Sequence, residues 1–120
     1  MQRSTHSPGE TMTDASLMAA LLDSMKDPVL LADTDHVIRY MNKPAIDHYE
    51  AGAALLGRSL LDCHNDDSRR QIVEILAAMR AGEEERLITD NQKHRIHMRA
   101  VRDPSGKLLG YYERYEPPEK

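Results

Sequence analysis

The sequence predicts an α+β fold whose sheet is assembled from both ends of the chain. Two short apolar runs, Val29–Asp33 and 37–41, flank a turn rich in Asp and have the composition of a β-hairpin. Helical and turn-like segments follow them, and three further strand-like runs close the chain. Because the first run is apolar throughout, it needs a neighbouring strand on each side. We therefore expect this hairpin to lie inside a sheet that the C-terminal strands complete.

The composition is that of one ordinary domain without a strongly charged surface. The chain has 120 residues, of which 40% are hydrophobic and 30% charged, and its formal net charge is −4. No basic excess is present to bind phosphates, so a nucleic-acid partner is not expected. The single cysteine excludes an internal disulfide and fits a reducing compartment. No apolar run reaches the length of a membrane span, so we expect a cytoplasmic protein without a membrane partner.

An amphipathic helix is predicted near the N-terminus. Residues 1–12 lack hydrophobic periodicity and are interpreted as a disordered lead to a single domain over 13–120. Either Thr13 or Asp14 is placed to cap the helix. The apolar residues that recur at helical spacing are Met18, Leu21, Leu22 and Met25. Because a short helix outside the core leaves such a stripe uncovered, we predict a homodimer through it.

One longer helix and three strands are predicted in the second half of the chain. The helix covers 68–81, with Asn65 among the candidate caps and Gly82 just beyond its end. Its apolar face consists of Ile72, Ile75, Leu76 and Met79. The strands are predicted over 86–89, 92–102 and 107–116. In the last strand Tyr111 and Tyr115 share a face with Leu109, which suits either a dimer surface or a pocket wall.

Taken in order, these segments resemble a PAS domain. The resemblance rests on PVLLADTDHVIRYMN, LLGRSLLD and AVRDPSGKLLGYYE and covers about residues 15–116. It implies a sensory domain built on a five-stranded antiparallel sheet, with helices over one face enclosing a ligand pocket. Together with the apolar first strand, it implies the strand order 2-1-5-4-3.

A second, narrower resemblance points to heme. The segment GRSLLDCHNDDSRRQIVEIL is similar to a stretch of carbon-monoxide-sensing heme PAS regulators, where a Leu-His-Pro supplies the proximal ligand. It implies heme b bound to iron through His64, and a diatomic gas as the signal. The family's second ligand matches Leu87 or a neighbour, which leaves Met98 as a substitute. The other expected cofactor contacts are Leu76, Ile96 and Cys63.

Other interpretations of these residues remain open. His64 could instead hydrogen-bond the helix entry or face water, which would make the chain a cofactor-free PAS module for dimerisation or protein–protein interaction. No nucleophile stands with a base and an orienting acid, so an enzyme is not expected. His94 and His97 are three apart on a strand and should point to opposite faces, so they cannot chelate one metal. Three arginines could bind a propionate or form a solvated face; they are Arg58, Arg69 and Arg70.

Overall fold

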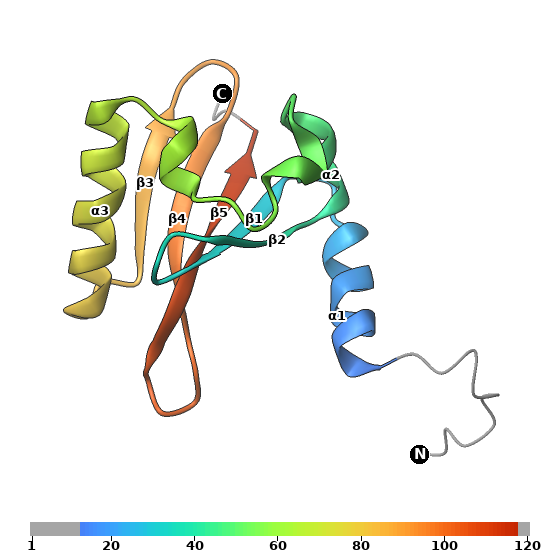
Figure 1. Cartoon of the computed structure of the whole chain (residues 1–120), viewed down its shortest axis with the longest axis horizontal. Helices are drawn as coiled ribbons and strands as arrows, with labels where there is room; N and C mark the ends of the chain where they lie inside the picture. The colour runs from blue at the N-terminus through green and yellow to red at the C-terminus, as the bar shows by residue number, and fades with distance from the viewer. Residues whose placement is uncertain (1–12, 118–120) are drawn as a thin grey trace, which may run out of the picture.

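The computed structural model describes residues 13–117 and shows a single sheet flanked by helices (Figure 1). The predicted lead over 1–12 lies outside the described residues. In chain order the elements are α1 (Asp14–Asp23), β1 (Val29–Asp33), β2 (Ile38–Met41), α2 (Lys43–His48), the 3₁₀ turns η2 (Gly52–Leu55) and η3 (Leu60–Cys63), α3 (Asp66–Arg80), β3 (Glu85–Asp90), β4 (Arg95–Arg102) and β5 (Leu108–Glu116). No helix among these residues is long and apolar enough to cross a membrane.

The sheet has the predicted strand order. Its five strands run β2-β1-β5-β4-β3, and every neighbouring pair is antiparallel. The apolar strand β1 pairs with β2 on one side and with β5 on the other, where Leu31 lies opposite Tyr112. The expectation that a continuous apolar strand occupies the interior of the sheet is confirmed, because both of its edges are hydrogen-bonded.

Asparagine side chains set the start of one helix and of one strand. Asn65 Oδ1 accepts a hydrogen bond from Ser68 N at 2.8 Å, so α3 starts at Asp66, two residues before the predicted start. Asn91 Oδ1 likewise accepts hydrogen bonds from Lys93 N and His94 N in the turn before β4. That turn occupies residues predicted as strand, so β4 begins only at Arg95.

A β-bulge overturns one expectation for the last strand. Val101 lies opposite Gly110 and Arg102 opposite Leu108, which leaves Leu109 without a partner on β4. Leu109 is therefore 47% exposed, whereas Tyr111 is fully buried. The prediction that these two side chains share a face was wrong, since a bulge shifts the alternation of side chains by one residue.

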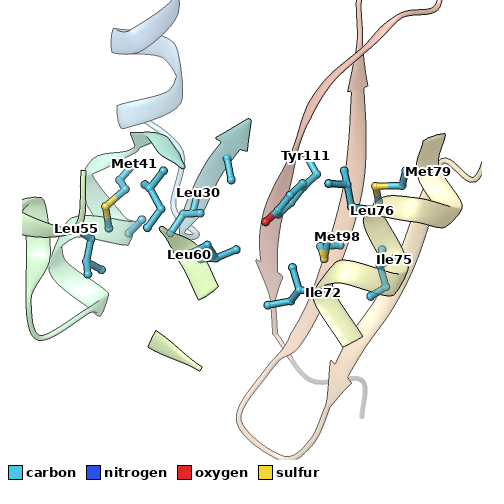
Figure 2. Close-up of a cluster of buried hydrophobic side chains, with 13 residues drawn as sticks. Leu30, Met41, Leu55, Leu60, Ile72, Ile75, Leu76, Met79, Met98 and Tyr111 are labelled. Atoms are coloured by element: carbon cyan, nitrogen blue, oxygen red, sulfur yellow. The ribbon is translucent and has the colours of Figure 1, made fainter. Parts of the chain in front are cut away.

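The hydrophobic core lies between the sheet and the helices that cover one of its faces (Figures 1 and 2). Figure 2 shows two groups of side chains within it. Leu30 and Met41 meet Leu55 and Leu60 under the short helices, and the side chains of α3 pack over Met98 and Tyr111. Helix α1 stands apart from this core, beside α2 and β2 (Figure 1).

Candidate functional site

A cavity of about 260 Å³ lies between the sheet and the helical layer. All five strands and every helical segment after α1 contribute to its wall or border it. Half of the lining side chains are apolar, and the other half carry polar groups. Its residues are Leu30, Ile38, Tyr49, Leu55, Leu60, His64, Ser68, Gln71, Ile72, Ile88, Thr89, Ile96, Glu113 and Tyr115. Apolar side chains and convergent polar groups together are what a small-molecule site requires, and this wall is richer in polar groups than most.

His64, the residue directly after η3, contributes its side chain to this wall. Its Nδ1 lies 2.8 Å from the carbonyl oxygen of Leu60, an acceptor, so Nδ1 carries the proton and donates. In the neutral ring Nε2 is then left as a free acceptor or metal donor. Arg69 Nε donates to the carbonyl of His64 at 3.0 Å and holds this segment against α3. The geometry thus presents one oriented imidazole.

Glu113 is the only carboxylate among the described residues of the wall. It lies on β5 opposite Leu30 of β1 and Met98 of β4, at the centre of the sheet, and is 4% exposed. Among the described residues its Oε2 has no hydrogen-bond partner. Burial raises the pKa of this carboxyl to about 7. A carboxyl this far from water is normally paired, so Glu113 is an exception among buried polar groups.

Two tyrosines form a polar edge of the cavity. The hydroxyls of Tyr49 and Tyr115 share a hydrogen bond, and burial raises the pKa of Tyr115 to about 12. The rings of His48 and His94 lie against Tyr115 at centroid distances of 4.9 and 5.0 Å. This aromatic cluster closes the space between α2 and the start of β4.

Of the six predicted cofactor contacts, two line the cavity. They are His64 and Ile96. Leu76 and Met98 are buried in the core under α3 and do not line it. Leu87 is 39% exposed and lies opposite His97 on the other face of the sheet. The side chain of Cys63 lies outside what the structure describes.

The pairing of β3 with β4 places Leu87 outside the cavity, and a bulge after it adds one residue to the wall. Leu87 pairs with His97 and Thr89 with Ile96, so Ile88 is the extra residue. Ile88 and Thr89 both line the cavity as a result. His97, on the outer face, has its ring nitrogens 3.4 Å from Glu85 and 3.3 Å from Glu116. His94 and His97 therefore lie on different sides of the sheet, as expected.

Sequence reasoning missed the polar groups that make the cavity distinctive. Tyr49, Gln71, Thr89 and Glu113 were not predicted as site residues. A signal existed for Glu113, because it stands between Tyr111 and Tyr115 at the alternate positions of one strand. A charged residue at a core-facing position is the informative exception in such a pattern.

The wall fits one axial bond to heme iron but does not fit heme b as a whole. His64 Nε2 is a suitable donor, and the Leu60 carbonyl provides the partner that orients metal-binding histidines. However, a cavity of about 260 Å³ is smaller than the roughly 300–1,000 Å³ that drug-sized ligands occupy. The lining contains no Lys or Arg to receive the carboxylates of a porphyrin, and it contains Glu113. Arg69 points its Nε to the carbonyls of Leu61 and His64 instead.

Among the side chains that the structure describes, no group of three or more His, Cys, Asp or Glu could hold a metal ion. The polar groups that the cavity offers for hydrogen bonding are a carboxyl, an imidazole, two phenols, two hydroxyls and one amide.

The fold is a small α+β unit in which helices cover one face of a five-stranded antiparallel sheet around a cavity. A family model described as PAS domain matches residues 18–116. The chain belongs to the PAS domain family. A comparison with curated proteins finds no match.

Solved structures share the fold at low sequence identity. The C-terminal domain of a Streptococcus mutans protein is 15% identical, with a TM-score of 0.73 and 90% of each chain covered. The PAS domain of Bordetella pertussis BvgS is 19% identical, with a TM-score of 0.63, covering 88% of this chain and 87% of that one. The Aer2 receptor from Vibrio cholerae, a dual PAS-heme oxygen sensor, is 16% identical, with a TM-score of 0.53, covering 77% of this chain and 94% of that one.

Proposed function

We propose that this PAS domain senses a small organic molecule bound in the cavity between the sheet and α3. The observation that carries the proposal is the cavity itself, whose wall combines apolar side chains with convergent polar groups. Its lining joins the end of α2, η2, η3 and α3 to all five strands. A ligand that contacts these elements together changes how they pack, and this is the physical basis of a sensor.

Heme b ligated by His64, for gas or redox sensing, is the second candidate. It is supported by the tautomer of His64: Nδ1 carries the proton that it donates to the carbonyl of Leu60, so Nε2 keeps a lone pair for iron. The heme sensor Aer2 shares the fold. Heme binding requires the helical layer to move away from the sheet, because the cavity is small for a macrocycle. His64 would hold the iron of such a heme, and the group would supply the binding of a diatomic gas or a change of redox state.

A visible absorption spectrum separates the two candidates. Purified protein is mixed with heme, and the Soret band is compared among wild type, His64→Ala, His97→Ala and Met98→Leu. If the cavity binds a small organic molecule and not heme, no Soret band should depend on His64. A Soret band that is present in wild type, retained in His97→Ala and lost in His64→Ala would overturn it in favour of heme.

Dimerisation without a cofactor is the third candidate. One surface favours its dimerisation part, with or without a ligand in the cavity. Helix α1 and the residues just after it expose Leu17, Met18, Leu21 and Met25, at 52, 52, 55 and 43% respectively. None of the residues of α1 is buried. We propose a homodimer contact at this stripe, which is compatible with either ligand.

A further inference from the structure

We propose that Glu113 is the recognition group of the cavity and selects a small ligand that carries a positively charged or N–H-donating nitrogen on an apolar body. This inference rests on the proposed function, because it identifies the class of molecule that the cavity accepts. Amines, amidines and protonated heterocycles belong to this class.

The position of Glu113 supports this assignment. The residue lies on β5 opposite Leu30, and both side chains line the cavity. Glu113 is 4% exposed, and its Oε2 has no hydrogen-bond partner among the described residues. A buried acceptor without a donor is destabilising. A donor on the ligand removes that penalty, and a charged donor forms the strongest such bond.

The charge distribution of the wall disfavours an anionic ligand. No Lys, Arg or Asp lines the cavity, so an anionic ligand would meet Glu113 with no compensating cation. The other titratable groups of the wall are His64 at the end of η3, Tyr49 at the end of α2 and Tyr115 from β5. The two tyrosine hydroxyls bond each other, and His64 Nδ1 is occupied by Leu60. Two acceptors then remain for a ligand, Glu113 and His64 Nε2, and the ionised carboxyl of Glu113 forms the stronger bond with a cationic donor.

Burial also makes the protonation of Glu113 sensitive to a bound cation. It raises the pKa of the carboxyl to about 7, so the protonated and ionised forms are close in free energy near neutral pH. A bound cation favours the ionised form and binds more tightly as pH rises. The size of the cavity, about 260 Å³, restricts the ligand to roughly one ring with a short substituent.

Three single-ring probes that differ in one group test the assignment. Benzamidine carries a cationic N–H donor and stays protonated over the whole working range, benzoate carries an anion, and benzyl alcohol is neutral. Binding of each probe to the full chain is measured by titration calorimetry and by amide chemical shifts. The protein forms are wild type, Glu113→Gln and Glu116→Gln. Glu116 is the matched control, because it lies on the same strand but pairs with His97 and Arg114 on the outer face.

We expect wild type to bind benzamidine more tightly than benzyl alcohol and to bind benzoate least. Glu113→Gln should weaken benzamidine about tenfold or more and leave benzyl alcohol unchanged. Glu116→Gln should bind all three as wild type does. Benzamidine should also bind wild type more tightly at about pH 8.5 than at about pH 5.5, and Glu113→Gln should lack this dependence.

The outcomes separate this inference from the proposed function. If benzyl alcohol binds but benzamidine shows no preference and no loss in Glu113→Gln, the role of Glu113 is wrong while the cavity site stands. If no probe shifts the amides of cavity residues, the cavity site itself fails, and this inference fails with it.

Discussion

The side-chain amide of Asn42 donates a hydrogen bond to the carbonyl oxygen of Leu22, 2.9 Å away, and so joins the end of α1 to the start of α2. Asn42 is fully buried. Its Nδ2 also donates to Asp27 O at 3.1 Å, and its Oδ1 accepts from Val29 N at 2.9 Å and Ala45 N at 3.0 Å. One residue therefore caps α2, holds the start of β1 and anchors α1.

Replacing this side chain should destabilise the domain and release α1. Asn42→Ala removes four hydrogen bonds and leaves buried backbone groups unpaired, so we expect the free energy of unfolding to fall by about 3 kcal/mol. Denaturant unfolding measures the loss, and amide exchange in α1 should rise. Asn65→Ala is the control, because Asn65 also caps a helix but is exposed, and it should lose only about 1 kcal/mol. Equal losses in the two variants would contradict this account.

The buried carboxyl of Glu113 should make stability depend on pH in the unusual direction. Its pKa rises from 4.5 to about 7 on folding, so between these values the folded state binds more protons than the unfolded state. Stability therefore falls as pH rises through this window, by up to about 3 kcal/mol, and below it this penalty disappears.

Glu113→Gln tests that linkage. The variant should be more stable than wild type above pH 7 and should approach wild type near pH 4, as measured by urea unfolding across the range. Glu116→Gln should keep the wild-type slope. A wild-type stability that rises steadily over the same window, unchanged in Glu113→Gln, would rule out a buried ionisable carboxyl.

Gly110 should be required for β1 and β5 to pair. A Cβ at this position would lie 2.2 Å from the carbonyl oxygen of Ala32 and 3.0 Å from Asp33 Cα. Backbone atoms cannot yield as a side chain does, so Gly110→Ala should separate the two central strands and cost about 3 kcal/mol. Thermal or urea unfolding would show the loss.

Gly57→Ala is the matched control for Gly110. Gly57 has φ +85°, and a Cβ attached there would meet no atom within 4 Å, so only the left-handed backbone is disfavoured. This substitution should cost about 1 kcal/mol. A Gly110→Ala protein as stable as Gly57→Ala would show that β1 and β5 are not as closely paired as described.

The α1 stripe should mediate association. Met18→Glu combined with Leu21→Glu places two charges in the exposed apolar surface and should convert dimers to monomers without unfolding the domain. Leu22 is left intact, because it is half-buried and its carbonyl accepts from Asn42. Sedimentation over a range of concentrations measures the change.

Val73→Glu is the control for the dimer test. Val73 is 47% exposed on α3, so the substitution adds a charge to another exposed apolar position and should leave the dimer intact. A wild-type protein that sediments as a monomer at high concentration would remove the basis for this interface.

Local chemistry in the sequence determined the elements and their order. The apolar β1 run implied two neighbouring strands, and the polar caps Thr13 and Asn65 start their helices as local rules require. A resemblance to heme PAS regulators, together with the apolar Leu60-Leu61 run beside it, suggested that His64 faces a pocket, and it lines the cavity. These features depend on residues close together in the chain, so pattern alone captures them.

The tertiary structure decided which side chains meet in the cavity. The bulge at Leu109 shifts the two-residue alternation, so Leu109 faces away from the side that an unbroken strand would give it. The bulge at Ile88 brings both Ile88 and Thr89 into the wall, while Leu87 faces outward opposite His97. Glu113 is buried without a partner for its Oε2 because β1 and β4 enclose it on both sides and α3 lies above, which no local pattern records. The absence of basic residues beside it is also a property of the assembled wall. Burial and charge compensation depend on contacts between distant segments, and only the packed chain defines those contacts.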